Sequence, residues 1–369
     1  MILLLTLLFS FQAHANDVVI GFVGGLTSEM AREARQAQAA MTIAIDEQNK
    51  KGDIIRGSKV RLEVFDTHND PLYSKSIVRD LKRRGVNAVV GLIGGEDDII
   101  LANYLEKARI PTVAEASTIP DLVKDKQFIV QTCIDHREQA RALANKLISI
   151  GKKRLIIVVN NTVNFNVQFA EYFVEYFKSV GGEIVARQSM NMRMGATRRL
   201  ASEVFKDEHK ADIILLDGTT IDSLSVWVEL KKLGTSIDYA SVDSIEYIEP
   251  DSFLKNLKDD FNIRIFNGFF NLNKLNKDGK VFYSKFNSRF PELAINSHSF
   301  DAVFTYDSTQ ILLKAIHQAG ATDSELIMNA LKSVHIEGVT GPLSYKPDGR
   351  TTRHVVFLSF RKGKIEDAE

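Results

Sequence analysis

The stretch Val18-Val19-Ile20-Gly21-Phe22-Val23-Gly24-Gly25-Leu26-Thr27-Ser28 decides the fold of this chain. Its first half is an apolar run of the kind that forms a strand buried on both faces of a sheet. The glycines then permit a tight turn, and Ser28 can cap a following helix. Apolar residues from Met30 to Ala44 recur at steps of three and four, which indicates that helix. A buried strand that turns directly into a helix predicts an α/β sheet.

The glycines of this turn invite comparison with a dinucleotide-binding loop. Gly21, Gly24 and Gly25 do not have the G-x-G-x-x-G spacing that such a loop requires. A tight strand-to-helix turn is therefore the favoured interpretation.

The residues before this strand read as an export signal. Residues 2–11 are almost all apolar, and Ala13-His14-Ala15 has the small-x-small form of a cleavage site. The run is shorter than the ~20 residues that span a bilayer. We therefore expect residues 1–15 to be a cleavable signal peptide, the alternative being an uncleaved buried strand. No cysteine stands at the expected cleavage site, so we expect no lipid anchor.

Composition excludes some classes of partner. The 47 Lys and Arg residues equal the 47 Asp and Glu residues, and a chain without excess positive charge does not favour nucleic acid. Cys133 is the one cysteine, so no internal disulfide forms, and we expect a buried, inert thiol. Export without disulfides fits the bacterial periplasm.

Strand and helix signals alternate in two runs, the second of which starts after Cys133. Such alternation predicts doubly wound parallel sheets, and two runs predict two lobes of ordinary domain size. Helices expected in the second run cover 136–150, 165–180, 197–206 and 221–233. The strands expected after the first one are 59–66, 88–93, 112–114, 128–130, 155–159, 183–186, 212–216, 239–242 and 264–270.

The last hundred residues break this rhythm. Helices are expected at about 276–290, 299–319 and 323–333 with no strand between them. Because helices alone cannot extend a sheet, we expect them to return and cover the first lobe. Segments 341–345 and 353–360 then flank a turn at 346–349.

Candidate binding residues lie in the first lobe where strands end, since open parallel sheets bind ligands at their carboxyl edge. Gly94-Gly95 opens a helix and exposes backbone N–H groups that suit an anion, but the acids 96–98 could equally cap that helix. Ala116-Ser117-Thr118 offers two hydroxyls for a polar group. These hydroxyls could equally cap a helix that begins at Pro120.

Small polar residues also follow the strands of the second lobe. They include Asn160 to Phe165, Gly218 to Thr220, and Asp243, all at expected carboxyl ends. Asp243 could also be a helix cap or a surface acid. The shared position of these segments indicates a binding site.

Enzyme signatures are weak. The chain has no H-E-x-x-H, G-x-S-x-G or Walker A motif, and its eight histidines are scattered. His136, at a helix start, and His317 are expected to be structural. We therefore expect no catalytic activity, no cofactor and no metal.

The order of these motifs resembles that of the branched-chain amino acid (Leu/Ile/Val) substrate-binding proteins of bacterial ABC transporters, which are type I periplasmic binding proteins. The resemblance covers nearly all of residues 18–360. The residues that carry it are 20–27, 45–49, Gly52, 56–57, Asp66, 69–71, 89–91, 110–111 and 341–343.

The resemblance implies a Venus-flytrap architecture of two α/β lobes joined by three crossovers, near 133–136, 268–273 and 343–350. Lobe 1 would comprise 16–134 with 273–342, and lobe 2 would comprise 135–272 with 343–369. Such lobes close on a ligand held in the cleft between them.

The resemblance also implies roles in the first lobe. Gly95 matches the position whose hydroxyl holds the ligand's α-carboxylate, so that hydroxyl is missing here. Ala116 and Thr118 match a backbone carbonyl and a hydroxyl that bind the α-amino group, and Ser117 lies between them.

In the second lobe, Asp243 matches the acid that pairs with the ammonium group. Phe165 and Thr219 match two tyrosines that line the pocket. The aromatic side chain of the first helix region falls near Glu33 and is absent. The carboxylate-binding half of the site is therefore weaker than the amine-binding half.

These features together favour a periplasmic binding protein that delivers a small amino-acid-like ligand to ABC permease subunits in the inner membrane, and we expect a monomer. An amide, a cationic or hydroxylated amine, or another small polar metabolite fits equally well. A ligand sensor that signals to a receptor or regulator is one alternative function. An exported hydrolase on the same scaffold is another.

Overall fold

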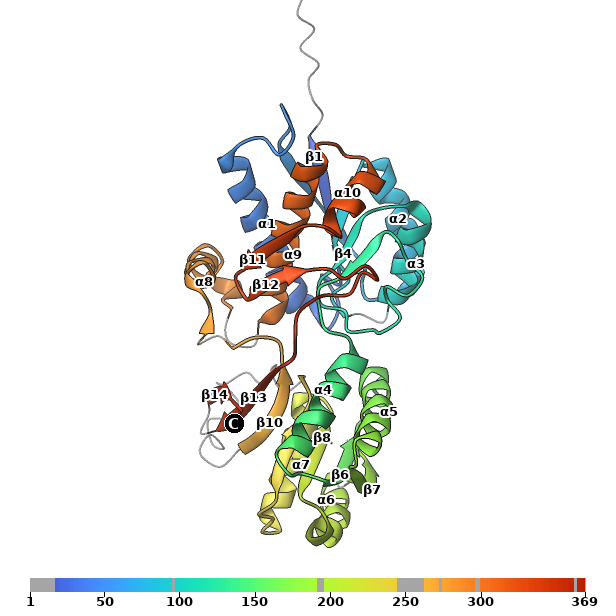
Figure 1. Cartoon of the computed structure of the whole chain (residues 1–369), viewed down its shortest axis with the longest axis vertical. Coiled ribbons are helices and arrows are strands. Elements are labelled where there is room, and N and C mark those ends of the chain that lie inside the picture. Colours follow the sequence, from blue (N-terminus) through green and yellow to red (C-terminus); the bar gives the residue numbers. More distant parts are fainter. Residues whose placement is uncertain are drawn as a thin grey trace, which may run out of the picture.

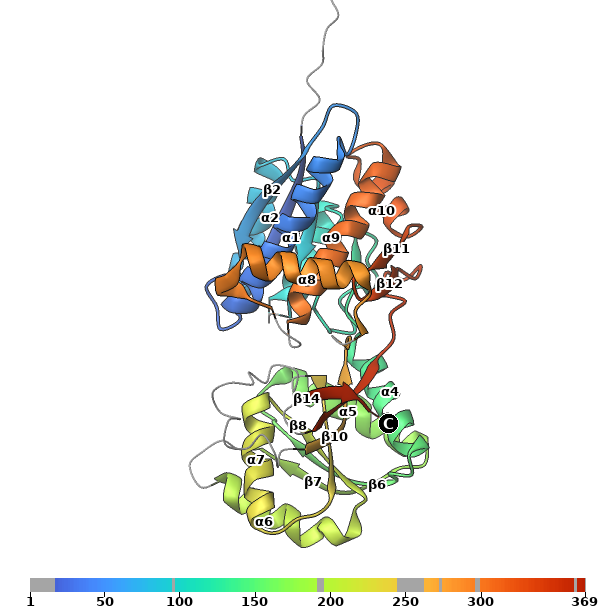
Figure 2. The same ribbon diagram turned by 90° about the vertical axis from the view of Figure 1, so that its left-hand side faces the viewer.

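The computed structural model describes residues 17–94, 97–190, 196–243, 262–271, 274–295, 299–361 and 364–368. Two α/β lobes follow one another along the long axis of the molecule (Figures 1 and 2). Each lobe is built around one main sheet. The expected fold class is thus confirmed.

The sheet of the first lobe has five parallel strands in the order β2-β1-β3-β4-β5. All residues of β1 are buried, because β2 and β3 pair with its two edges and helices cover both faces. This is the environment that its apolar sequence predicts. The strands are β1 (Val18–Gly24), β2 (Val60–Asp66), β3 (Ala88–Gly91), β4 (Thr112–Ala114) and β5 (Ile129–Gln131).

Helices sandwich this sheet. Residues of α1, α9 and α10 share a core with Ile20 and Phe22 on one face, whereas α2 and α3 pack with Val19 and Val23 on the other. The C-terminal helices therefore return to the first lobe as predicted, and α9 lies along α1 (Figure 2). The helices are α1 (Ala31–Lys51), α2 (Ser74–Arg83), α3 (Asp98–Ala108), α8 (Lys277–Arg289), α9 (Phe300–Ala319) and α10 (Ser324–Leu331).

The second lobe has a seven-stranded sheet in the order β14-β13-β10-β9-β8-β6-β7. The strands from β6 to β10 are parallel, as predicted. The chain end adds β13 and β14 in antiparallel orientation. These strands are β6 (Arg154–Val159), β7 (Glu183–Ser189), β8 (Ile213–Asp217), β9 (Asp238–Ser241), β10 (Asn262–Gly268), β13 (Val356–Arg361) and β14 (Lys364–Asp367).

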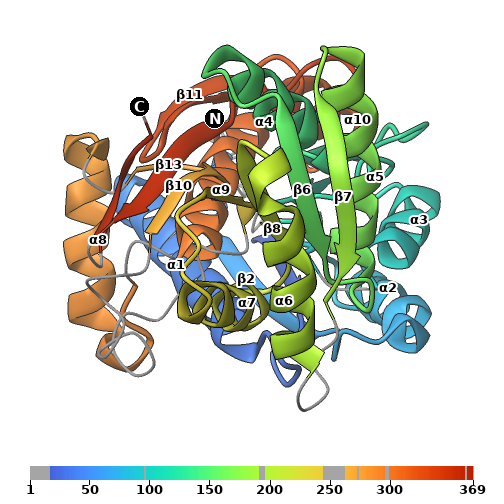
Figure 3. The same ribbon diagram turned by 90° about the horizontal axis from the view of Figure 1, so that it is seen from below.

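Helices cover both faces of this sheet too (Figure 3). Leu155, Ile157 and Val159 point toward α4 and α5, whereas Ile156 and Val158 pack with α6 and α7. The alternation follows from the two-residue period of a strand. The helices are α4 (His136–Ser149), α5 (Asn164–Ser179), α6 (Ala196–Asp207) and α7 (Thr220–Lys232).

The chain passes between the lobes after β5, after β10 and before β13. The two segments that flank the turn at 346–349 go to different sheets: β12 (Gly341–Ser344) pairs with β11 (His335–Gly338), whereas β13 joins the second lobe. The bridge Gln131–Arg350 ties the turn to the first lobe, and the bridge Tyr345–Thr351 closes the turn itself. The predicted lobe bounds stay a prediction, and we propose that the third crossover lies at 352–355 rather than at 343–350.

No helix within the described ranges has the length and apolar character needed to cross a bilayer. The predicted signal peptide, residues 1–15, lies outside those ranges.

Candidate functional site

The loop after β4 is buried at the carboxyl edge of the first sheet. Ala116 and Ser117 are buried, and Thr118 is half-buried. The carbonyl of Ser117 accepts a hydrogen bond from Gln131 Nε2 at 2.7 Å, which fixes the loop to the end of β5. The alternative that these hydroxyls cap a helix from Pro120 is wrong, since the residues after Pro120 form turns.

His136, which the sequence analysis interpreted as a structural residue, contacts both Thr118 and Phe165. Thr118 Oγ1 lies 2.5 Å from His136 Nε2, and the carbonyl of Thr118 accepts from the backbone N–H of His136 at 3.0 Å. The half-buried ring of Phe165 meets the His136 ring edge-on, with centroids 4.4 Å apart. A first-lobe loop thus contacts the start of α4, which in turn contacts the start of α5.

His136 is a neutral hydrogen-bonding group in this structure. Burial lowers the pKa of His136 to about 3, so the imidazole carries no charge at neutral pH. Its position could have been found from the sequence, because it begins α4 directly after the capping residue Asp135 and the end of β5. Its contact with Thr118 could not.

In the second lobe, acids gather at the ends of β8 and β9. Asp217 is fully buried, and its Oδ1 accepts from Asn166 Nδ2 at 2.7 Å. Burial raises the pKa of Asp217 well above its ordinary value, and the negative charge of Asp243 raises it further. Asp243 itself is buried, so the alternative of a surface acid is wrong.

Thr219 has a structural task. It is the N-cap of α7 and forms a capping box with Asp222: Asp222 N–H donates to Thr219 Oγ1 at 3.3 Å, and Thr219 N–H donates to Asp222 Oδ2 at 3.1 Å. Asn160 Nδ2 donates to the same Asp222 oxygen at 2.6 Å. The exposed Thr219 hydroxyl also donates to that carboxylate, so its hydrogen bonds serve the helix end.

Two buried carboxyl groups lie behind the first-lobe loop. Glu115 and Asp301 are both fully buried, and none of their carboxyl oxygens has a hydrogen-bond partner in the part of the chain that the structure describes. Burial raises the pKa of Glu115 well above its ordinary value, and the charge of Asp301 adds to this. Burial, followed by the charge of Glu33, raises the pKa of Asp301 to about 8.

Gly95 lies outside the described residues. Next to it, the backbone N–H of Gly94 donates to Asp98 Oδ2 at 2.9 Å, within the first turn of α3. The Asp98 carboxylate therefore already accepts the hydrogen bond from an N–H group that a bound anion would need. Asp97, the N-cap residue of α3, makes no side-chain capping hydrogen bond, so anion binding and helix capping both stay predictions for this segment.

Carboxyl groups from both lobes act electrostatically on Cys133, at the first crossover. Burial raises the pKa of the Cys133 thiol well above its usual range, and Asp243, Glu115 and Asp301 each raise it further. Cys133 is buried and not disulfide-bonded, as predicted. The site thus combines hydroxyls, a neutral imidazole and several acids, a set that suits hydrogen bonding to a polar or cationic molecule. No group of three or more His, Cys, Asp or Glu within the described ranges could hold a metal ion.

A family description of periplasmic binding proteins matches this chain over residues 17–364. Among curated relatives, a Leu/Ile/Val-binding protein of Rhizobium johnstonii, BraC3, is 26% identical over all of this chain and 98% of its own length.

Solved structures agree on the fold. The branched-chain amino acid transporter substrate-binding protein LivJ of Streptococcus pneumoniae, in complex with isoleucine, superposes with a TM-score of 0.75 at 21% identity, covering 96% of this chain and 99% of its own. A solute-binding protein of an R. palustris ABC transporter, in complex with 4-hydroxybenzoate, gives a TM-score of 0.78 at 18% identity and covers 96% of each chain. With a match that runs from the first strand to the last, the chain belongs to the periplasmic binding protein family, and its relatives include branched-chain amino acid-binding proteins of ABC transporters.

Proposed function

We propose that this protein is an extracytoplasmic solute-binding protein, exported by residues 1–15, that binds a small amino-acid-like ligand between its lobes. The lobes close about the three crossovers, and the closed monomer delivers the ligand to ABC permease subunits in the inner membrane. The observation that carries this proposal is the Thr118–His136–Phe165 contact, which joins a strand end of one lobe to two helix starts of the other. The seven predicted contact residues remain part of the proposal.

The charge of the site favours a ligand with an amino group. Each of three buried acids, Glu115, Asp301 and Asp243, raises the pKa of the Cys133 thiol. Burial raises the pKa of both Glu115 and Asp301 because ionising them without a countercharge is costly, and a bound ammonium group would offset that cost. A benzoate such as that of the R. palustris complex carries a negative charge instead of a positive one and cannot offset that cost, so we expect it to bind poorly.

The Thr118–His136 pair bears on the hydrolase alternative. A hydroxyl within 2.5 Å of an imidazole has the geometry of a nucleophile and its base. An efficient base has a pKa near the working pH, whereas that of His136 is about 3. Within the described ranges nothing hydrogen-bonds to His136 Nδ1 to orient the ring. Binding without turnover is therefore the better-supported function.

A thermal-shift screen of residues 16–369 tests the proposal. The library holds amino acids, their amides, polyamines and small carboxylates. A hundredfold excess over the dissociation constant should stabilise the protein by about 2.7 kcal/mol. We expect amine-bearing compounds to raise the melting temperature, and Asp243→Asn to remove that rise. A response confined to carboxylates, or one that Asp243→Asn leaves intact, would contradict the proposed ligand class.

A further inference from the structure

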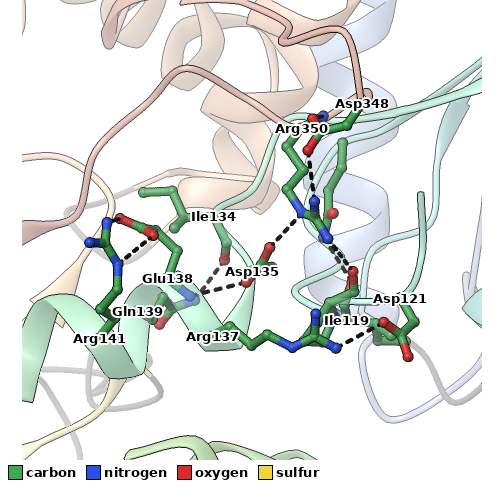
Figure 4. A network of polar contacts seen from close by, with 12 residues as sticks. Ile119, Asp121, Ile134, Asp135, Arg137, Glu138, Gln139, Arg141, Asp348 and Arg350 are labelled. Atoms are coloured by element: carbon green, nitrogen blue, oxygen red, sulfur yellow. Dashed lines mark hydrogen bonds and ion pairs between the residues drawn. The ribbon is translucent and has the colours of Figure 1, made fainter. Parts of the chain in front are cut away.

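A pocket lies at the hinge, and none of the seven proposed ligand contacts lines it. Its volume is about 410 Å³. Part of its wall comes from α4 of the second lobe, and part from the turn that the bridge to Gln131 ties to the first lobe. The lining residues that matter here are Arg137, Glu138, Arg141, Lys346, Asp348 and Arg350 (Figure 4, which omits Lys346).

Arg350 joins the crossovers on one side of the pocket. Its Nε lies 3.0 Å from Asp135 Oδ2 in the first crossover, and its Nη2 donates to the carbonyl of Pro120 at 3.2 Å. Its Nη1 pairs with Asp348 at 2.7 Å (Figure 4). On the α4 side, Arg141 pairs with Glu138 at 2.6 Å, on the same helix.

Among the lining residues, cationic side chains outnumber acidic ones, although Arg137 and Arg353 pair with acids outside the lining, Asp121 and Asp307. Five cationic side chains and three acidic ones line the pocket, and His354 adds a titratable group. Lys346 is exposed and takes part in none of the ion pairs between described residues. Arg353 is 7% exposed; its Nη2 pairs with Asp307, but its Nε and Nη1 have no hydrogen-bond partner in the described part of the chain. The Arg353 guanidinium also lies over the Phe304 ring, 4.3 Å from its centroid. The gathering of Arg and Lys side chains on one wall favours an anion.

We propose that this hinge pocket binds a small oxyanion with at least two negative charges, of the phosphate or polycarboxylate class, and that the anion acts on lobe movement. Arg141 and Lys346 reach it from different lobes. An anion that contacts both stabilises the arrangement in which they lie close together. By linkage, it shifts the equilibrium between open and closed forms without touching the ligand contacts.

Inorganic phosphate and citrate are the probes, and sodium chloride at equal ionic strength is the reference. Calorimetric titration compares the unmodified chain with the double variant Arg141→Gln/Lys346→Gln. Both side chains are exposed, so neither change leaves a buried charge unpaired. The matched control, Lys75→Gln/Arg199→Gln, removes the same two charges from exposed positions that do not line the pocket.

We expect at least one probe to bind the unmodified chain and the control, and to bind the pocket variant at least tenfold more weakly. Equal binding to all three proteins, or no binding beyond that of chloride, would overturn the anion site. Small-angle X-ray scattering tests the proposed effect of the anion on lobe movement. A radius of gyration that does not change when the bound probe saturates the site would overturn the effect on lobe movement.

Discussion

At the scale of single residues, the Thr118–His136 hydrogen bond is the most informative contact. Thr118→Val keeps the shape of the side chain but removes the oxygen, so the buried imidazole loses its partner at Nε2. Leaving a buried polar group unsatisfied costs about 1–3 kcal/mol. We predict that Thr118→Val lowers the free energy of unfolding, measured in urea, by this amount. The free energy of unfolding of Thr118→Ser should stay close to that of the unmodified protein. Equal stability of the valine and serine variants would contradict the importance of this bond.

The buried acids predict a pH dependence of stability. The folded pKa of Asp301 is about 8, against 3.8 for the exposed group, so the folded protein holds a proton that the unfolded chain releases. The stabilisation from this proton is complete below pH 3.8 and is lost as the pH rises through about 8. The slope is at most about 1.4 kcal/mol per pH unit.

Asp301→Asn removes this titration while keeping the size of the side chain. We therefore predict that its free energy of unfolding, measured between pH 5 and pH 8, falls less steeply than that of the unmodified protein. Parallel curves for the two proteins would show that Asp301 does not titrate in this range.

Sequence reasoning located some of the site and missed the rest. It placed Thr118 and Asp243 at strand ends, because a strand's polar boundary is a local signal. It did not find that Asp301 acts electrostatically on Glu115, because that interaction depends on how α9 returns to the sheet far along the chain. It assigned Thr219 to the ligand through the resemblance, whereas the structure shows its hydroxyl in a helix cap. Whether Thr219 also contacts the ligand stays a prediction.

At the scale of elements, the α7 cap separates the two roles of Thr219. Losing a capping hydroxyl typically costs about 1 kcal/mol. We predict that Thr219→Ala lowers the free energy of unfolding by this amount and also weakens ligand binding, and that Thr219→Ser restores both. A ligand affinity that stays within twofold in the alanine variant would leave Thr219 with the capping role alone.

The strand–helix rhythm of both lobes was predictable, because buried parallel strands are apolar and glycines end the helices between them. The fate of the chain end was not. Segments 341–345 and 353–360 read alike as strands around a turn, yet they join different lobes. A tertiary contact, the Gln131–Arg350 bridge, ties the turn between them to the first lobe.

At the scale of the whole molecule, Arg350 ties two crossovers together. Its partner Asp135 is 7% exposed and also caps α4, so removing the guanidinium leaves a nearly buried carboxylate without its cation. We predict that Arg350→Gln destabilises the protein by about 1–3 kcal/mol. The neighbouring pair offers a control: Asp121 is 52% exposed, so Asp121→Asn should cost far less. Equal destabilisation by Arg350→Gln and Asp121→Asn would contradict a stabilising role of Arg350 at the hinge.

Closure of the two lobes on an amine ligand is the central claim, and small-angle X-ray scattering tests it most directly. The measurement compares the radius of gyration of residues 16–369 alone and with a saturating amine-bearing compound from the thermal-shift screen. We predict a smaller radius with the compound, and no change in Asp243→Asn at the same concentration. A bound compound that leaves the radius of the unmodified protein unchanged would contradict capture by hinge closure.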